Sequence, residues 1–570
     1  MILLNTLQIA ALFLCLLLLT KPVGLYLYRI YETSSPFPLL NRLEGRLLKW
    51  CCFKHDEQDW KAYLKSLLVF NFMGIMILFL LERFQGFLPL NPQNFPSVPW
   101  DLALNVAVSF TTNTNWQAYS GETTMSYFTQ MIGLTWQNFV SASTGMTVFL
   151  ALARGLSRHP TSPQDIYLGN FWIDLLRSVF YVFLPGAFLL ALFFASQGVI
   201  QNFSPTLHIS TLEGWQELIS MGPVASQEAI KILGTNGGGF FGANSAHPFE
   251  NPTPLTNFLQ MLAMLLIPAS LTYTYGKITQ NQKQGWSIFL AMFVLAILGA
   301  FLISCFEAQP NPLLTSFSID QSLGNMEGKE LRFGTLGSAH YASVTTDISC
   351  GATNSLHDSF TPLGGMVLLV NMLVGEVIFG GVGIGLFSMI IFIIITVFIA
   401  GLMVGRTPEY LGKKIESKEI RFAILFMAIF PLVILVGTAA AVLTPQGLAS
   451  IQDAGPHGLS EILYAFISAT QNNGSAFGGL NANTTWYNLF LALAMLIGRY
   501  LPIYLGLAIA GLMVNKKIIH ASPGTFSTQG PLFIILLLSV IIIVGALTFF
   551  PVLALAPLLE YMNLLQGKGF

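Results

Sequence analysis

Long apolar stretches alternate with short polar segments along the whole chain. A helix needs about 20 apolar residues to cross a bilayer. We therefore expect about ten spanning helices, near residues 2–20, 63–83, 129–153, 172–196, 254–276, 286–306, 363–404, 420–443, 487–513 and 531–556. The pattern predicts an all-α polytopic membrane protein.

Four shorter segments break this pattern. They cover residues 102–111, 224–234, 341–345 and 462–470, and each is too short to span a bilayer. We interpret them as re-entrant half-helices. A small, polar, mostly uncharged loop follows each one, and the loop richest in glycine reads Gly-Thr-Asn-Gly-Gly-Gly at 234–239. Non-helical backbone at membrane depth is tolerated only where it is buried in protein or lines a wet cavity.

The four loops recur at near-constant spacing. Gly237 lies 122 residues after Asn115, Gly351 lies 114 after Gly237, and Gly474 lies 123 after Gly351. Such self-similarity indicates repeated units. We expect four fused repeats, each made of a span, a half-helix, a loop and a second span, that place four loops around one axis. The expected units are pore repeats at 62–154, 171–277, 285–404 and 419–514, with an extra N-terminal span at 1–21 and a C-terminal span at 530–557.

Composition and charge placement support a membrane protein. Hydrophobic residues make up 54% of the chain and charged residues 9%, whereas soluble domains carry about a quarter charged residues. Lys and Arg gather in alternate loops, at 22–61, 154–158, 277–283, 406–418 and 516–517. The positive-inside rule places these loops in the cytosol, with both termini and the four polar loops outside. Cys51 and Cys52 lie in the first basic loop, where we expect them to be reduced.

The loop residues suit one kind of ion. Gly, Asn, Thr and Ser offer uncharged oxygens, which match a weakly hydrated monovalent cation. Calcium or magnesium would favour carboxylates. The alternative interpretation is that these small polar residues only allow helices to pack closely.

The predicted span at 363–404 is about twice the length that a bilayer requires. Its middle, 375–385, contains five glycines and the carboxylate of Glu376. We expect this stretch to break the helix into two pieces. The unwound part, with Glu376, Gly380 and Gly381, would gate the ion path or open a side exit below the third loop. Alternatively, Glu376 only ends one helix at an interface.

Enzyme motifs are absent from the sequence. It has no phosphate-binding G-x-x-x-x-G-K-[ST], no H-E-x-x-H, no G-x-S-x-G and no D-K-T-G phosphorylation site. Cys350 is a nucleophile in principle, and His357 with Asp358 forms a lone His–Asp pair. No basic partner for Cys350 is evident, so a place in the third loop is the better interpretation. We expect no ATP hydrolysis by this chain alone.

Several long stretches, at 112–122, 234–252, 349–352, 375–383, 405–414 and 472–479, resemble the potassium-translocating A subunits of Kdp-type potassium-transporting ATPases. The resemblance runs nearly end to end, and it implies a fold of four fused membrane–pore–membrane repeats around a central K⁺ channel-like filter. It implies a bacterial inner-membrane protein that binds K⁺ from outside and needs no organic cofactor. It also implies three partners: a P-type ATPase B subunit that hydrolyses ATP, a single-span C subunit and often a small F peptide. The ion would leave sideways through a tunnel toward the B subunit, with the broken helix as gate.

The resemblance also assigns residues. The implied filter positions are Asn113, Thr114, Asn115, Thr235, Asn236, Gly237, Ser349, Cys350, Gly351, Asn472, Asn473 and Gly474. Gln117 and Gly238 would support the filter, although any of Gly237–Gly239 could face the ion. The alternative function belongs to a different class: a stand-alone K⁺ channel or an ion-coupled K⁺ symporter with the same fold.

Overall fold

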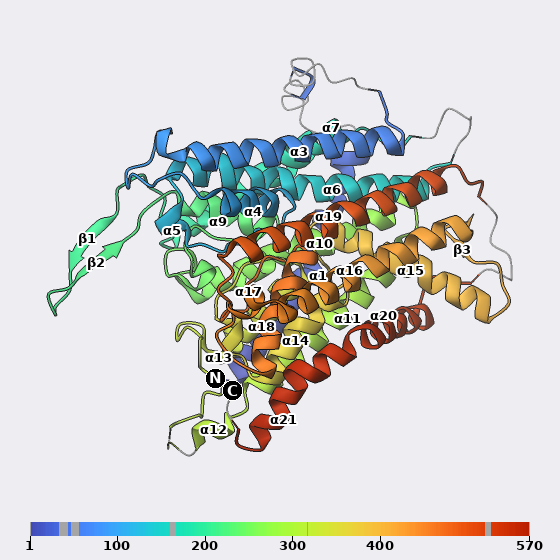
Figure 1. Cartoon of the computed structure of the whole chain (residues 1–570). Coiled ribbons are helices and arrows are strands. Elements are labelled where there is room, and N and C mark those ends of the chain that lie inside the picture. The colour runs from blue at the N-terminus through green and yellow to red at the C-terminus, as the bar shows by residue number, and fades with distance from the viewer. Residues whose placement is uncertain are drawn as a thin grey trace.

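The structure, a computed structural model, describes residues 2–33, 44–46, 56–159, 167–315, 317, 319–518 and 526–568. Figure 1 shows long helices that run side by side, with a two-stranded hairpin projecting from one end of the bundle. The marks for the N- and C-terminus lie at that same end. The expected all-α polytopic fold is confirmed.

Within the described residues, ten helices are long and apolar enough to cross a membrane. In chain order they are α1 (Ile2–Glu32); α3 (Trp60–Phe84) with η1 (Gln85–Phe87); η2 (Thr129–Thr135) with α6 (Trp136–Ser157); α7 (Phe171–Arg177), η3 (Ser178–Phe183) and α8 (Leu184–Ser196) in one run; α10 (Pro254–Ile278); α11 (Gln282–Glu307); α15 (Ile384–Met403); α16 (Ser417–Leu443); α19 (Thr485–Val514); and α20 (Pro531–Leu553) with η6 (Ala554–Leu558) and α21 (Leu559–Leu565). An even number of crossings returns the chain to the side on which it began.

The remaining elements are short. The half-helices are α4 (Trp100–Thr111), α9 (Val224–Leu233), α13 (Gly334–Asp347) and α18 (Pro456–Thr470). A further short helix, α14 (Pro362–Leu373), precedes α15. Single turns are α5 (Gly121–Thr124), η4 (Asn244–Ala246), α12 (Pro312–Thr315), η5 (His357–Ser359) and α17 (Pro445–Leu448). Strand β1 (Leu207–Ser210) pairs antiparallel with β2 (Gln216–Ile219), and β3 (Glu409–Tyr410) pairs with β4 (Lys413–Lys414).

The spanning helix after each polar loop lies deeper in the protein than the one before it. In the most apolar stretch of each helix, 94% of residues are buried in α6 and 72% in both α10 and α15, against 22% in α3 and 33% in α16. The following helices therefore surround the centre, and the preceding helices face lipid. This is the plan expected of membrane–pore–membrane repeats, although the exact repeat boundaries stay a prediction.

The first helix is longer than the sequence suggested. We expected a span over 2–20 and a basic loop from 22 onward, but α1 continues past Lys21 and Pro22 to Glu32, so Arg29 lies on the helix. The extension is held by packing against α10. Thr274 Oγ1 donates to the carbonyl of Gly24 over 3.0 Å, and only glycine leaves room there. Cys51 and Cys52 lie outside the described residues.

The third half-helix is also longer than the sequence suggested. We expected it over 341–345, but α13 begins at Gly334 and includes Thr346 and Asp347, which we had assigned to the loop. Every residue from Thr335 to Asp347 is buried. A helix surrounded by protein on all sides has no lipid-facing stripe, so its polar first half carried no apolar signal.

The expected break in the seventh span is confirmed. Helix α14 ends at Leu373 and α15 begins at Ile384. Between them the backbone is left-handed at Gly375, Glu376, Phe379, Gly380 and Gly383. Two of these residues carry a side chain, which makes the conformation costly unless the surroundings hold it.

Candidate functional site: a ring of four loops

The four polar loops begin with the same backbone conformation. The first left-handed residue after each half-helix is Asn113, Thr235, Ser349 or Asn472, with φ between 48° and 66°. Two residues later, Asn115, Gly237 and Gly474 are left-handed again, whereas Gly351 is not. A positive φ is uncommon outside glycine. The equivalence inferred from spacing therefore appears in the backbone itself.

The first and second loops are joined by side-chain amides. Asn236 Nδ2 donates to Asn113 Oδ1 over 2.6 Å, and Asn113 Nδ2 donates to the carbonyl of Thr235 over 3.2 Å. The second and third loops then meet through backbone. A Cβ added at Gly237 would overlap Gly351, so these two backbones can approach only because neither carries a side chain.

The contacts continue until the ring closes. A Cβ at Gly351 would lie 2.8 Å from the carbonyl carbon of Gly474, which joins the third loop to the fourth. The fourth loop returns to the first, because Asn472 Nδ2 donates to Thr114 Oγ1 over 2.8 Å and a Cβ at Gly474 would overlap the Thr114 carbonyl. The four loops thus form a closed ring in chain order.

A cavity of about 460 Å³ opens on one side of this ring. Every loop contributes to its lining, which includes Asn115, Gly238, Gly351 and Gly474. The four half-helices end where the loops begin, so their C-terminal carbonyls, which carry partial negative charge, gather at the ring. This electrostatic arrangement favours a cation.

Gln117 lines the same cavity and joins the first loop to the second. Its Nε2 donates to the carbonyl of Gly239 over 3.0 Å, and the N–H of Gly239 donates back to its Oε1 over 2.8 Å. Nearby, Glu122 accepts a hydrogen bond from the N–H of Gly242. Burial and the charge of Glu250 raise the pKa of Glu122 above its usual value. Both side chains tie the first repeat to the second.

The broken helix contacts the ring directly from the other side. The N–H of Val382 donates to Thr235 Oγ1 over 2.9 Å, and the N–H of Gly380 donates to the carbonyl of Asp347 over 3.1 Å. Gly381 lies beside Thr235 Oγ1. The unwound segment therefore touches the second loop and the end of the third half-helix at once.

Glu376 and Arg499 form the charged part of this region. Both side chains are nearly fully buried, and the positive charge of Arg499 attracts the carboxylate of Glu376 electrostatically. Glu376 Oε2 has no hydrogen-bond partner among the described residues. A buried carboxylate with an unpaired oxygen is costly, which makes it a candidate for function.

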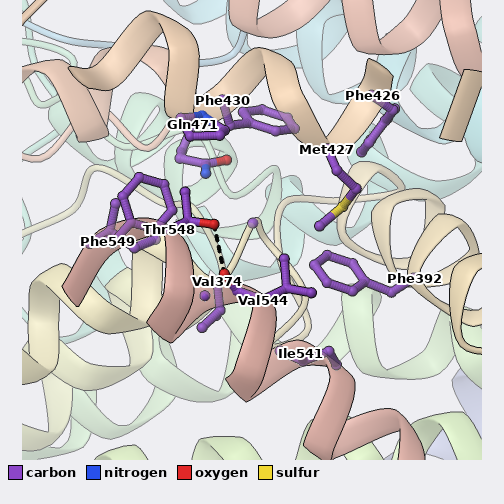
Figure 2. Close-up of a pocket in the computed structure, with 14 residues that line it drawn as sticks. Val374, Phe392, Phe426, Met427, Phe430, Gln471, Ile541, Val544, Thr548 and Phe549 are labelled. Carbon is purple, nitrogen blue, oxygen red and sulfur yellow. Dashed lines mark hydrogen bonds between the residues drawn. The ribbon is translucent and has the colours of Figure 1, made fainter. Parts of the chain in front are cut away.

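A pocket lies next to the break in the helix (Figure 2). Val374 comes from the break, Gln471 comes from the end of α18, and Thr548 and Phe549 come from α20. Both polar atoms of the Gln471 amide lack a hydrogen-bond partner among the described residues. The pocket thus joins the fourth loop, the broken helix and the outer helices α16 and α20.

Comparison with known proteins identifies the family. The family model described as "KdpA: Potassium-transporting ATPase A subunit" matches residues 10–562. The chain belongs to the KdpA family. One relative, the potassium-transporting ATPase potassium-binding subunit of Brucella anthropi, is 52% identical over 97% of both chains. The subunit of the same name from Serratia proteamaculans is 52% identical over 99% of both chains.

A solved structure supports the fold. The potassium transporter TrkH from Vibrio parahaemolyticus matches with a TM-score of 0.52, covering 87% of this chain and 96% of its own. The two sequences are 14% identical, so this likeness concerns architecture alone. It agrees with the channel-like repeat plan of this KdpA family member.

In this KdpA family member, the backbone of Cys350 and the ring of His357 bond to different groups. Cys350 is fully buried in the third loop, with its N–H bonded to the Thr345 carbonyl. His357 Nδ1 bonds to the hydroxyl of Tyr464 over 2.8 Å. The interpretation of Cys350 as a loop residue agrees with this geometry.

Sequence reasoning missed a buried charge cluster behind the second loop. Lys231 Nζ lies 2.6 Å from both Glu228 Oε2 and Glu250 Oε2, and all three side chains are buried. Glu250 also accepts a hydrogen bond from the N–H of Phe241 over 2.9 Å. This bond fixes the backbone where the chain leaves the second loop. The signal was available, since a lysine three residues after a glutamate is unusual in a short membrane-embedded segment.

Proposed function

We propose that this chain is the K⁺-binding and translocating subunit of an ATP-driven potassium uptake pump. The observation that carries the proposal is the closed ring of four uncharged loops at the base of a cavity. Its oxygens suit a weakly hydrated monovalent cation. The names of the relatives, potassium-binding subunits of potassium-transporting ATPases, support potassium as that cation.

The filter consists of three residues from each loop, and each loop contributes the same backbone positions. The set is Asn113, Thr114, Asn115, Thr235, Asn236, Gly237, Ser349, Cys350, Gly351, Asn472, Asn473 and Gly474. In the second loop we assign Gly237 to the ion-facing position, because its backbone meets Gly351 of the neighbouring third loop. Gly239 is not assigned to this position, because Gln117 occupies both its N–H and its carbonyl.

The broken helix is the gate. Glu376, Gly380 and Gly381 lie in the unwound segment that contacts the ring, where a change of backbone conformation would open or close the path below the filter. We place the sideways exit beside Gly375, and the pocket of Figure 2 at this position supports that assignment. Such an exit suits a chain that passes its ion to a neighbouring subunit and does not release it directly to the cytosol.

The partner supplies the energy. A P-type ATPase B subunit hydrolyses ATP, since this chain carries no ATP-hydrolysing motif. A single-span C subunit and a small F peptide complete the complex. The chain itself is non-catalytic and binds no organic cofactor. It resides in a bacterial inner membrane with both termini outside, which agrees with ten crossings and with the basic alternate loops.

The second candidate is a stand-alone K⁺ channel or ion-coupled symporter. The shared architecture with a potassium transporter favours it at the level of fold. The pocket beside the broken helix favours the pump subunit, because a channel needs an exit along its own axis.

ATP hydrolysis by the purified complex distinguishes the two candidate functions. The tagged chain is isolated gently from native membranes, and its co-purifying ATPase activity is titrated with K⁺ and then with Na⁺. Stimulation by K⁺ but not by Na⁺ supports the pump subunit. Absent hydrolysis, together with K⁺ flux from the chain alone in liposomes, supports the channel or symporter.

A further inference from the structure

Away from the ring, four side chains converge where the third loop exits and the fourth half-helix begins. They are Asp358, Asp453, His457 and Glu461, and we call them the outer carboxylate–histidine cluster. One ligand atom from each lies within 4.8 Å of all the others. His457 and Glu461 are four residues apart at the start of α18, so they share one face of that helix.

The imidazole of His457 is held between two carboxylates. Its Nδ1 lies 3.1 Å from Glu560 Oε1, and its Nε2 lies 3.0 Å from Asp358 Oδ1. A metal-binding histidine usually gives its second ring nitrogen to a carboxylate, which fixes the ring orientation. Glu560, which is outside the cluster, occupies that supporting position and directs Nε2 toward the cluster.

Glu461 supplies an independent sign that a ligand belongs here. The residue is fully buried, and its Oε1 has no hydrogen-bond partner among the described residues. A Cβ added at Gly479 would overlap this oxygen and would lie 3.1 Å from Asp358 Oδ1. Two carboxylate oxygens therefore converge beside a glycine, where no side chain fills the space between them.

Charge balance points to a cation. Across the described part of the chain, His457 is the one basic side chain that forms an ion pair with any of the three cluster carboxylates. Glu461 is buried and Asp358 and Asp453 are partly buried, and gathering three carboxylates around one imidazole is costly unless a further cation joins them. A cavity of about 270 Å³ gives access, and its lining includes Glu327 together with Asp358, Asp453 and His457.

We propose that the outer carboxylate–histidine cluster binds a divalent transition-metal cation of the Zn²⁺ or Mn²⁺ type. An imidazole with carboxylates suits these ions, whereas Ca²⁺ and Mg²⁺ prefer oxygen ligands alone. Two ligand atoms in the tetrahedral geometry usual for zinc, each about 2.1 Å from the ion, lie about 3.4 Å apart. His457 Nε2 and Asp358 Oδ1, which lie 3.0 Å apart in a hydrogen bond, would separate slightly to admit the ion.

The metal would brace the filter from outside. The N–H of Asp358 donates to the carbonyl of Phe477 over 2.8 Å, so this ligand already connects the exits of the third and fourth loops. Glu560 adds the C-terminal helix to the same connection. A bound ion would hold these three parts together and raise the unfolding temperature of the protein.

The test uses the full-length chain with its co-purifying subunits, stripped with chelator and titrated with Mn²⁺ while free Mn²⁺ is measured by electron paramagnetic resonance. We expect one saturable site per chain. His457→Gln should abolish it, Glu461→Gln should weaken it, and Glu560→Gln should lower affinity about 10- to 100-fold. The matched control is His208→Gln, on the exposed strand β1, which should bind Mn²⁺ as the unmodified chain does.

A parallel thermal-unfolding series compares Zn²⁺, Mn²⁺, Ca²⁺ and Mg²⁺. Stabilisation by Zn²⁺ or Mn²⁺ that is lost in Glu461→Gln supports the site, and this variant covers the case in which His457→Gln does not fold. The proposal is overturned if the unmodified chain shows no saturable Mn²⁺ binding. It is also overturned if both cluster variants bind as the control does, or if Ca²⁺ and Mg²⁺ stabilise as strongly as Zn²⁺.

Discussion

The N–H of Val382 donates a hydrogen bond to the hydroxyl of Thr235 over 2.9 Å. Thr235 belongs to the second loop of the ring, and Val382 belongs to the unwound segment between α14 and α15. Both groups are buried. This single bond connects the place where an ion would be selected to the segment that would gate its exit.

Replacing Thr235 with valine removes this bond while keeping the side-chain shape. The N–H of Val382 then stays buried without a partner, which costs about 1–3 kcal/mol. We expect the amount of K⁺ taken up per ATP hydrolysed to fall about fivefold or more in proteoliposomes. The control is Thr272→Val, since the hydroxyl of Thr272 donates to the carbonyl of Ala269 in its own helix. An unchanged ratio would show that the bond does not couple filter to gate.

Gly237→Asp tests the ring itself. Gly237 has a φ of +80° and touches the backbone of Gly351, so any side chain forces two loops apart. We expect the K⁺ concentration for half-maximal ATP hydrolysis to rise about tenfold or more, with the complex still assembled. Gly214→Asp is the control, since Gly214 has a φ of +85° and no neighbour within 4 Å. Equal K⁺ dependence in the two variants would remove Gly237 from the filter.

How far the sequence predicts this site depends on whether the signal is local. The glycines at 237–239 and the recurring spacing of the loops are local features, and they indicated both the half-helices and the ring. The pairing of Lys231 with Glu250 spans the second loop, so only the folded chain brings it together. The first turns of α13 were missed because a fully buried helix needs no apolar stripe.

The same reasoning explains the error at the first helix. Lys21 and Pro22 are usual signs of a helix end in the sequence. In the structure they lie within α1, because contact with α10 at Gly24 stabilises the continuing helix. Tertiary packing outweighed the local preference.

Gln117→Leu removes the reciprocal pair of hydrogen bonds with Gly239. Each is worth about 0.5–1.5 kcal/mol, so we expect a fivefold to hundredfold loss of apparent K⁺ affinity. Gln201 forms a similar reciprocal pair with Ser226 away from the ring. Gln201→Leu should therefore leave the affinity unchanged. Equal effects of the two variants would mean that Gln117 acts only on general stability.

Glu376→Ala tests the gate. The change leaves Arg499 without its neighbouring carboxylate and releases the unwound segment. We expect K⁺-stimulated ATP hydrolysis to persist while K⁺ uptake into proteoliposomes falls. Glu57→Ala, which removes a half-exposed partner of Arg158, is the control. Uptake at the unmodified rate would reject a gating role for Glu376.

The most direct measurement is the position of the bound ion. The complex is crystallised with Tl⁺, a K⁺ substitute whose anomalous scattering marks its sites. The account predicts Tl⁺ between Asn115, Gly237, Gly351 and Gly474, weakened by competing K⁺ and unaffected by Na⁺. Tl⁺ bound elsewhere in the chain, with none inside the ring, would contradict the account.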